Sequence, residues 1–472
     1  MRYVSTRGEA PACGFEDALL AGLAPDGGLF VPETWPTFSA GEIEALRGKS
    51  YPELAAALMT PYLNGEITTD VFAGLAAEAY RGFEDDAVAP LVELEPGLWL
   101  LELFHGPTLA FKDIALQVLG RLFDHVLSAR GERVTIVGAT SGDTGSAAIE
   151  ACRDRAALTV FILHPKGRIS EVQRRQMTTV QASNIHNIAI DGTFDNCQAL
   201  VKALFADAAF RAEMRLAAVN SINWVRVMAQ CVYYFSAGLA LGAPDRELVF
   251  SVPTGNFGDV YAGHVARHMG LPIRRLLVAT NRNDILTRFF DTGVYRKSAV
   301  EPSLSPSMDI QVASNFERLL FELLGRNGAA VAALMAKFVE RGEFALDARC
   351  TGEAQGLYRG TRVDDAATLA TIAAVEQQTG RVVDPHSATG IAAAKGSRDG
   401  EAPVVCLATA HPAKFPDAVE QATGKRPVLP TRLADLMTRP ERCCELPNDL
   451  NTLREHIRAD AGAGQALTEG VA

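Results

Sequence analysis

A repeated order of apolar strand, glycine-rich turn and helix is the feature that most restricts the fold of this chain. A β-branched run at residues 134–137 leads into the turn at 138–145 (GATSGDTG), and residues 248–252 lead into the turn at 253–259 (PTGNFGD). Near-continuous apolar strands that alternate with helices are typical of parallel sheets covered on both faces. The predicted fold class is α/β, with further strands at residues 158–163, 185–190, 276–279 and 404–408.

Residues 1–92 are predicted to form a separate N-terminal domain. A turn at 25–28 (PDGG) precedes a short strand at 29–31. Helical periods follow at residues 40–47, 51–63 and 68–80. Residues 93–430 are assigned to the α/β core. Residues 431–472 are assigned to a C-terminal helix near 450–458 and a small, polar tail from 459 that we expect to fray.

Charge and apolar patterning restrict the partners and the location of the chain. The 45 basic residues are outnumbered by 56 acidic ones, and a net charge of −11 argues against nucleic acid as a partner. No apolar stretch approaches the ~18 residues of a membrane span, and the first residues do not resemble a signal peptide. We therefore expect a cytoplasmic protein without a membrane partner. The eight cysteines are scattered with no C-x-x-C pair, so neither a metal site nor a disulfide framework is predicted.

The two glycine-rich turns are candidate anion sites. Each follows a strand and precedes a helix, where unpaired N–H groups and the helix dipole favour a negative charge. Neither turn matches the glycine patterns that bind nucleoside triphosphates or dinucleotides. One such turn alone is equally consistent with a tight strand-to-helix connection that binds nothing. Two of them in one chain favour two bound anionic groups.

Lys112 is a candidate nucleophile in the segment 102–113 (ELFHGPTLAFKD). It lies between Phe111 and Ile114 at a predicted helix start, where partial desolvation would lower the pKa of its amine and free it for imine chemistry. The alternative is an amphipathic lysine whose stem packs on the core while its ammonium reaches water. Composition alone favours that alternative.

Six segments in order carry a more specific signal. The segments are 102–113, 140–145 (TSGDTG), 220–223 (NSIN), 253–259, 384–390 (DPHSATG) and 408–415 (ATAHPAKF). Together they resemble threonine synthases, pyridoxal-phosphate enzymes of fold type II. The segments 3–8 (YVSTRG) and 26–32 (DGGLFVP) resemble the longer branch of this family. The resemblance covers residues 3 to about 430. It implies a tryptophan-synthase-β-like core of two subdomains with parallel sheets and an additional N-terminal domain.

The resemblance also implies site residues. Lys112 corresponds to the lysine that bonds to pyridoxal 5'-phosphate and acts in catalysis, and Thr409 corresponds to the residue at the pyridine nitrogen. The loop around the cofactor phosphate corresponds to Gly255, Asn256, Phe257, Gly258 and Asp259. The implied substrate contacts are Ser141, Asp143, Thr144, Asn220, Asn223, Arg226 and His386. For His386, a substrate contact and a helix-capping role remain equally open.

The activity implied is that of a lyase in threonine biosynthesis, acting as a monomer or homodimer. It would convert O-phospho-L-homoserine and water to L-threonine and phosphate by γ-elimination and β-addition. Arg226, three residues after Asn223 and on the same helix face, is the first candidate for the substrate phosphate. The second candidate for the substrate phosphate is the basic stretch of Lys166, Arg168, Arg174 and Arg175. The alternative is that this stretch is a solvated helix face. The alternative functions are a fold-type-II threonine or serine deaminase and a non-catalytic ligand-binding homologue.

Overall fold

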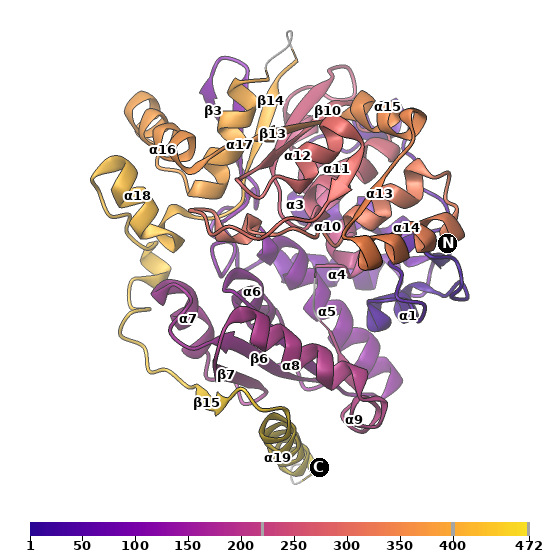
Figure 1. Cartoon of the computed structure of the whole chain (residues 1–472), viewed down its shortest axis with the longest axis vertical. Helices are drawn as coiled ribbons and strands as arrows, with labels where there is room; N and C mark the ends of the chain where they lie inside the picture. The colour runs from indigo at the N-terminus through magenta and orange to yellow at the C-terminus, as the bar shows by residue number, and fades with distance from the viewer. Residues whose placement is uncertain (219–220, 398–401, 470–472) are drawn as a thin grey trace. The chain divides into compact units, whose positions relative to one another are not determined.

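The computed structural model describes residues 1–218, 221–397 and 402–469. The chain divides into two compact units. The first consists of Met1–Leu19, Leu23–Ala115 and Ser221–Pro427, and the second of Leu20–Gly22, Leu116–Asn220 and Val428–Ala472. Figure 1 shows the order of the elements along the chain.

The N-terminal part of the first unit combines capped helices with two paired strands that are separated by α1 (Phe15–Ala21). These strands, with Thr6 and Arg7 directly after the first, are called the N-terminal hairpin. The strands β1 (Tyr3–Ser5) and β2 (Phe30–Pro32) pair antiparallel. Serine and glutamate form capping boxes at α2 and α3, and a left-handed Asn64 ends α3. The predicted helix at 51–63 is confirmed, and that at 40–47 is shorter. The helices are α1 (Phe15–Ala21), α2 (Ala40–Glu44), α3 (Tyr51–Leu63) and α4 (Thr69–Tyr80).

A six-stranded sheet forms the centre of the first unit, in the order β13-β10-β9-β14-β4-β3. All neighbours are parallel except β3 and β4. The strands are β3 (Leu91–Glu95), β4 (Leu98–Glu102), β9 (Leu248–Pro253), β10 (Ile273–Thr280), β13 (Tyr358–Arg362) and β14 (Val404–Ala408). The predicted strands at 248–252, 276–279 and 404–408 are confirmed, whereas β4 was not predicted.

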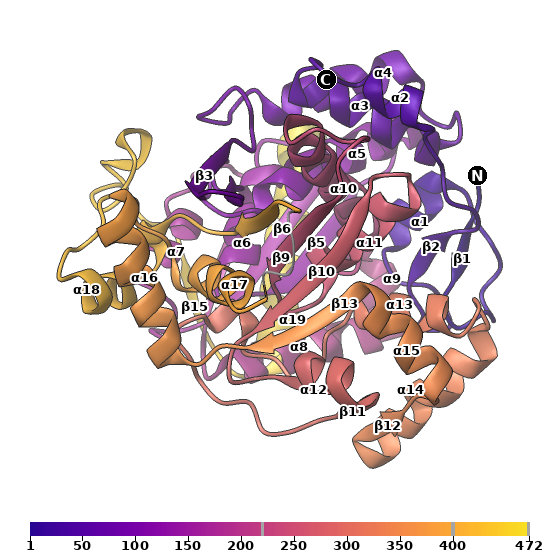
Figure 2. The same cartoon turned by 90° about the horizontal axis from the view of Figure 1, so that it is seen from above.

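Helices cover both faces of this sheet. On one face, residues of α16 and α17 form an apolar cluster with Leu100 and Cys406. On the other, the ring of Tyr234 on α10 lies 4.7 Å from that of Phe250, and α11 packs beside it. Figure 2 shows α17 and α11 on opposite sides of β9 and β10. The remaining elements of this unit are α10 (Trp224–Ala240), α11 (Gly258–His268), α12 (Ile285–Thr292), β11 (Val294–Arg296), η1 (Pro306–Met308), α13 (Phe316–Leu323), α14 (Gly328–Arg341), β12 (Glu343–Ala345), α15 (Ala348–Leu357), α16 (Asp365–Thr379), α17 (Pro385–Lys395), η2 (Pro412–Lys414) and α18 (Pro416–Thr423).

The second unit contains a five-stranded sheet in the order β15-β7-β6-β5-β8, with every pair parallel. The predicted strands at 134–137, 158–163 and 185–190 are confirmed. The strands are β5 (Val134–Ala139), β6 (Leu158–Pro165), β7 (Ile185–Asp191), β8 (Leu216–Ala217) and β15 (Cys444–Pro447). The helices are α5 (Lys112–Arg130), whose first residues belong to the first unit, α6 (Asp143–Cys152), α7 (Glu171–Thr178), α8 (Phe194–Ala206), α9 (Ala208–Glu213), η3 (Thr431–Leu433) and α19 (Leu450–Glu469).

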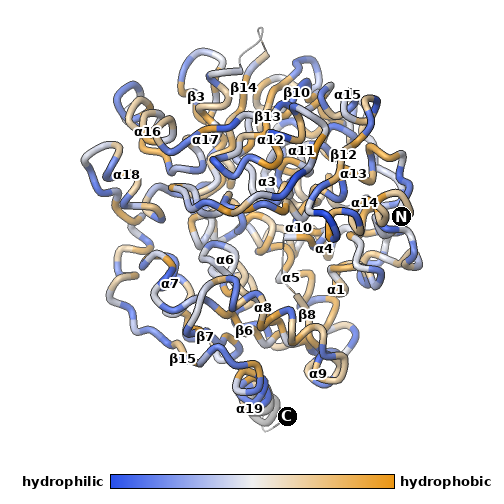
Figure 3. Tube along the Cα trace, in the orientation of Figure 1, coloured by the Kyte–Doolittle hydropathy of each residue, from blue (hydrophilic) through white to orange (hydrophobic). Residues whose placement is uncertain are grey.

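The C-terminal helix is longer than expected. The sequence predicted a helix near 450–458 and a frayed tail, but α19 continues to Glu469. Leu453 and Ile457 on this helix are fully buried in one apolar cluster with Phe161 and Leu204. Figure 3 shows hydrophilic and hydrophobic stretches side by side on α19, as an amphipathic helix requires. Among the described helices, none has the length and apolarity needed to cross a membrane.

Both sheets agree with the α/β prediction, and the sheet order of the first unit locates the candidate site. Three adjacent parallel strands, β9, β14 and β4, end at the same edge. The turn at 254–259 follows β9, Thr409 follows β14, and the segment that contains Lys112 follows β4. In open α/β sheets, ligands bind at the carboxyl ends of the strands.

Candidate functional site

The lysine segment is paired with the segment after β14 through backbone hydrogen bonds. Phe111 N donates to Thr409 O at 2.9 Å, and His411 N donates to Leu109 O at 3.0 Å. Ala110 and Ala410 form an antiparallel bridge between these two contacts. Lys112 and Thr409, predicted from motifs about 300 residues apart, therefore lie on adjoining backbone segments.

Lys112 begins α5 directly after a strained turn. Leu109 has φ +63°, a left-handed conformation that is uncommon for a leucine and needs surrounding support. Asp113 supplies it as a fully buried carboxylate that accepts hydrogen bonds from N and Oγ1 of Thr108, both at 2.7 Å. The buried Lys414 Nζ donates to Thr108 O at 2.7 Å. Burial raises the pKa of Asp113, while the bonds from Thr108 and the charge of Lys414 act in the opposite direction.

The turn after β9 has the geometry of an anion cradle. Phe257 has φ +65°, and α11 begins at Gly258. Within residues 1–218, 221–397 and 402–469, the N–H groups of Gly255, Asn256, Phe257 and Gly258 have no hydrogen-bond acceptor. Four free donors at a helix start fit a phosphate. A Cβ on Gly255 would lie 2.6 Å from Ser307 O, so this glycine is required by the neighbouring 3-10 turn η1.

Three charged side chains interact electrostatically at this cradle: Asp259, Lys112 and Arg226. Burial raises the pKa of Asp259 to about 6, against the opposing effects of nearby N–H groups and of Lys112 and Arg226. Burial lowers the pKa of Arg226 to about 10, while Asp259 and Tyr233 act to raise it. Arg226 is only 5% exposed, and its Nε and Nη1 have no hydrogen-bond partner among the described residues. Burying a guanidinium whose N–H donors lack acceptors is unfavourable unless an anion accepts hydrogen bonds from them.

The segment that contains Arg226 is joined to the cradle by side chains not predicted from the sequence. Ser221 Oγ lies 3.1 Å from Ser314 Oγ, and Ser314 Oγ donates to Asn256 Oδ1 at 3.3 Å. Asn315 N and Nδ2 both donate to Asn256 O, at 3.0 and 3.1 Å. Ser314 and Asn315 precede the apolar helix α13, a pattern typical of a helix start, and nothing in it indicated a ligand site.

The two predicted asparagines have different outcomes. Asn223 is the N-cap of α10, since its side chain accepts from Val225 N. Its Nδ2 donates to Leu19 O at 2.8 Å, so both ends of the amide are used within the fold. Asn220 lies outside the described residues.

His386 has a partner at both ring nitrogens. Ser307 N donates to its Nε2 at 3.2 Å, which places the ring proton on Nδ1, 2.6 Å from an oxygen of Asp384. Asp384, not His386, caps α17 by accepting from the N–H groups of His386 and Ser387. Thr409 N donates to Ser387 Oγ at 3.2 Å, so this helix start also orients the segment at Thr409.

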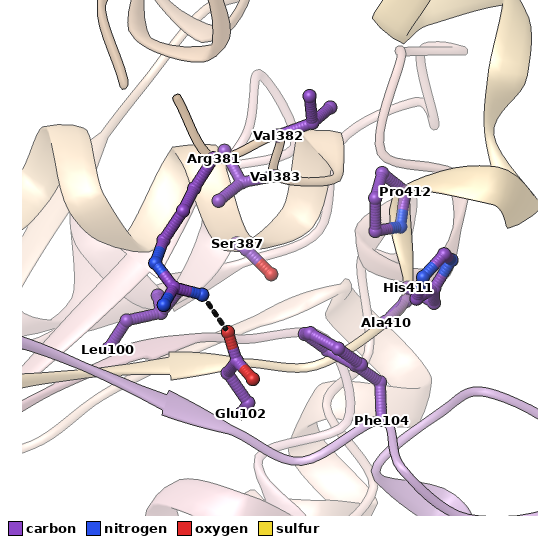
Figure 4. A pocket seen from close by; sticks show the side chains of 10 residues that line it. All are labelled: Leu100, Glu102, Phe104, Arg381, Val382, Val383, Ser387, Ala410, His411 and Pro412. Atoms are coloured by element: carbon purple, nitrogen blue, oxygen red, sulfur yellow. Dashed lines mark hydrogen bonds and ion pairs between the residues drawn. The ribbon is translucent and has the colours of Figure 1, made fainter. Parts of the chain in front are cut away.

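A pocket of about 230 Å³ borders the Thr409 segment on the α17 face of the sheet (Figure 4). Ser387 and Ala410 form the wall shared with Thr409, and Arg381 Nη1 donates to Glu102 Oε1 at 3.2 Å across another wall. The full lining consists of Leu100, Glu102, Phe104, Arg381, Val382, Val383, Ser387, Ala410, His411 and Pro412.

In the second unit, the turn after β5 holds the other predicted substrate residues. Thr140 Oγ1 accepts from the N–H groups of Gly142 and Gly145, at 3.0 and 2.9 Å, which fixes the turn. Asp143 Oδ1 accepts from Gln173 Nε2 at 2.8 Å. Ser141 is exposed, and Thr144 is half-buried.

Three of the four basic residues of this stretch in the second unit form ion pairs. Lys166 Nζ lies 2.6 Å from a carboxylate oxygen of Glu445, and Arg174 pairs with Glu441. Arg175 pairs with Glu171 at 3.3 Å. These contacts support the alternative of a solvated helix face. Elsewhere in the described chain, no group of three or more His, Cys, Asp or Glu side chains is arranged to hold a metal ion.

Family sequence models match almost the whole chain. The family described as "Threonine synthase N terminus" matches residues 2–80, "Pyridoxal-phosphate dependent enzyme" matches 85–410, and "Threonine synthase, C-terminal" matches 387–457. The chain belongs to the threonine synthase family. The predictions of a pyridoxal-phosphate-dependent lyase, of fold type II and of an N-terminal extension to it are confirmed.

Individual relatives agree with the threonine synthase assignment. A threonine synthase of Pseudomonas aeruginosa is 57% identical over 99% of this chain and 100% of its own. A crystal structure of PLP-bound threonine synthase from Brucella melitensis superposes with a TM-score of 0.96 at 54% identity, covering 98% of this chain and 99% of that one. The yeast threonine synthase structure gives 0.94 at 39% identity, with coverage of 98% and 99%. The alternative of a deaminase is not favoured.

Proposed function

We propose that the protein converts O-phospho-L-homoserine and water to L-threonine and inorganic phosphate. The observation that carries this proposal is the pair of anion-seeking groups at one edge of the first unit. The free N–H groups of 255–258 fit one phosphate, and the buried, incompletely bonded guanidinium of Arg226 fits a second. An enzyme that acts on a phosphorylated amino acid with a phosphorylated cofactor needs two such places.

The residues of the first unit fit pyridoxal 5'-phosphate. Gly255, Asn256, Phe257 and Gly258 would hold its phosphate through their N–H groups, with Asp259 at the start of α11. Thr409 would hydrogen-bond to its pyridine nitrogen. When bound, this cofactor supplies an electron sink that stabilises a carbanion beside the substrate nitrogen. Lys112 would hold the cofactor covalently.

Lys112 would also move protons during the reaction. When it is not bonded to the cofactor, its amine would serve as the base for the protons at the substrate Cα and Cβ. The hydroxyl of Thr409 is a weaker partner for a pyridine nitrogen than a carboxylate would be. We infer that this choice moderates the electron sink and favours elimination over amino transfer.

Substrate recognition is assigned to two sets of side chains. Arg226 would pair with the phosphate, while Ser141, Asp143 and Thr144 would contact the amino-acid part. Asn223 is bonded within the fold, and we assign it to positioning Arg226 three residues later. Asn220 completes the proposed set. His386 would act by holding the turn η1 against Gly255.

Several properties of the whole protein are part of the same proposal. We propose a cytoplasmic monomer or homodimer that binds no nucleic acid. The domain boundaries proposed are 1–92, 93–430 and 431–472.

A product assay tests the function directly. Purified protein loaded with pyridoxal phosphate is incubated with O-phospho-L-homoserine, L-serine or L-threonine, and threonine, phosphate and oxo acids are measured. We expect equimolar threonine and phosphate from the first substrate. Oxo acid from serine or threonine at a higher rate would identify a deaminase. Absence of turnover with all three would identify a ligand-binding homologue.

A further inference from the structure

Arg318, on α13, is a buried cation at the junction of three segments of the first unit. Its side chain is fully buried. Its Nε and Nη2 donate to Phe30 O at 3.1 and 2.9 Å, and Nη2 also donates to Ile222 O at 2.6 Å. Its Nη1 bonds to Asn315 Oδ1. The arginine thus joins the N-terminal hairpin, the segment before α10 and the segment before α13.

Two of these partners belong to the walls of the proposed phosphate sites. Ile222 lies between Ser221 and Asn223 in the segment that leads to Arg226. Asn315, held by Arg318, donates from Nδ2 to Ser221 O at 3.0 Å and to Asn256 O at 3.1 Å. The side-chain amide of Asn315 therefore bridges the segment that leads to Arg226 and the turn that would hold the cofactor phosphate. The guanidinium of Arg318 in turn holds that amide.

We propose that Arg318 is a positioning residue that sets the spacing between the loop that holds the cofactor phosphate and the segment that holds the substrate phosphate. This inference rests on the proposed function. A planar guanidinium suits the role because its donors diverge in a fixed fork, so three acceptors are held at once in one geometry.

The chemistry of the junction favours this role over simple charge pairing. The acceptors of Arg318 are two carbonyl oxygens and one amide oxygen. The neighbouring carboxylate of Glu317 instead accepts from Thr6 Oγ1 at 2.7 Å and from Arg7 Nη2 at 2.9 Å. The positive charge therefore adds to that of Arg226 in a region that must receive two phosphates, and this also favours anions.

Anchoring of the N-terminal hairpin is the competing explanation, and Glu317 provides the matched control. Both residues hold the hairpin, Glu317 through Thr6 and Arg7 and Arg318 through Phe30. The hydrogen bonds of Glu317 all go to the hairpin, whereas those of Arg318 and Asn315 also reach Ile222 and Ser221, in the segment that leads to Arg226. If the hairpin alone mattered, Glu317→Gln and Arg318→Met would have the same effect on anion binding.

The experiment measures inorganic phosphate binding to the holoenzyme by isothermal titration calorimetry, together with KM and kcat for O-phospho-L-homoserine. The variants are R318M, R318K, N315A and E317Q, with R226A as the reference for loss of the phosphate partner. Because binding of a phosphate by a guanidinium depends on the alignment of paired N–H donors, we expect phosphate affinity to fall about 10- to 100-fold in R318M and N315A. R318K, which keeps the charge but not the fork, should give an intermediate loss.

The expected signature separates positioning from stability. KM should rise more than kcat falls in R318M and N315A, and cofactor absorbance should shift because the spacing to the cofactor loop changes. E317Q should lower the melting temperature while phosphate affinity stays within about twofold of the parent, because among the described residues the hydrogen bonds of Glu317 go to Thr6 and Arg7 and not to the segments that would hold the phosphates. If E317Q weakens phosphate binding as much as R318M, or if R318M and N315A bind phosphate normally, the proposal is overturned.

Failure of the proposed function has a different pattern. If the parent protein neither binds phosphate nor releases it from phosphohomoserine, the two-phosphate site itself is wrong, and with it the spacing role. If R226A loses phosphate binding and R318M and N315A keep it, only the role of Arg318 fails. N315A leaves the Phe30 contact of Arg318 in place, so it decides the matter even if R318M does not fold.

Discussion

Replacement of Arg226 by methionine should make the unliganded protein more stable and the phosphate site weaker. The guanidinium is buried, and burial lowers its pKa to about 10. At 1.36 kcal/mol per pH unit, that fall from the ordinary pKa of an arginine corresponds to about 3 kcal/mol of unfavourable free energy for burying the charged form. Because the pKa in the folded protein is below that in the unfolded chain, this cost is fully present at every pH below about 10.

Methionine keeps much of the length and apolar surface of arginine without the charge. Part of the gain is offset by a small void and by loss of the favourable field at Asp259, so we expect Arg226→Met to add about 1–3 kcal/mol to the free energy of unfolding. The lost contacts with phosphate, at about 1.5–3 kcal/mol for each charged hydrogen bond, should weaken phosphate binding at least 10- to 100-fold.

Urea unfolding of both proteins at pH 7.5, without phosphate or substrate, measures the first effect, and calorimetric phosphate titration measures the second. Arg226→Lys is the control that keeps a cation, and it should retain more affinity than methionine. If Arg226 served only to brace the start of α10, its replacement by methionine would destabilise the protein. If Arg226→Met lowers the free energy of unfolding and leaves phosphate affinity unchanged, the reasoning from its unused donors is refuted.

Three further changes test the rest of the site. Lys112→Ala should abolish turnover and the covalent cofactor bond while the fold persists; borohydride attachment of the cofactor to another lysine, seen by peptide mapping, would contradict the assignment. Thr409→Val keeps the shape but removes the hydroxyl, so kcat should fall about 10-fold or more with little change in cofactor affinity; unchanged kcat and spectrum would leave it a packing residue. Asp259→Asn should stabilise the cofactor-free protein increasingly as pH rises from about 3.8 to about 6, because over this range the unfolded chain ionises the carboxyl while the raised pKa keeps it protonated in the folded protein. The stabilisation measured by urea unfolding should approach 3 kcal/mol at pH 7.5, from (6 − 3.8) × 1.36, and about half of that at pH 5, and a pH-independent value would refute it.

The strands that could be predicted are those whose sequence alone is distinctive. Apolar, β-branched runs such as 248–252 and 404–408 identified β9 and β14. The strand β13 (YRGTR) is polar and contains a glycine, and β15 (CELP) is four residues long and ends in proline. Such segments become strands because a neighbouring strand offers a free edge, and that information is tertiary.

The residues of the candidate site also fall into two groups, those within local motifs and those that act through contacts between distant segments. Lys112, Thr409 and the turn at 255–259 lie in local motifs, so the sequence was sufficient to propose them. Ser314, Asn315 and Arg318 act through contacts with segments about 60 to 290 residues away, which no local pattern encodes. Gly255 was also predicted from a local motif, but its reason could not be. The motif suggested that glycine leaves room for a phosphate, whereas in the structure a side chain at this position would collide with Ser307 O.

The position of β14 between β4 and β9 has a consequence for biosynthesis. Val404 pairs with Leu98, so two strands that lie side by side are separated by about 300 residues of chain. At about 5–20 residues per second, a ribosome needs roughly 15 to 60 s to proceed from one to the other. After β9 has been made, about halfway through that interval, both β4 and β9 lack their shared neighbour, and their apolar edges are open to other strands. Fragments that end before residue 404 should therefore aggregate, and the nascent chain should depend on chaperones until its last sheet strand has emerged.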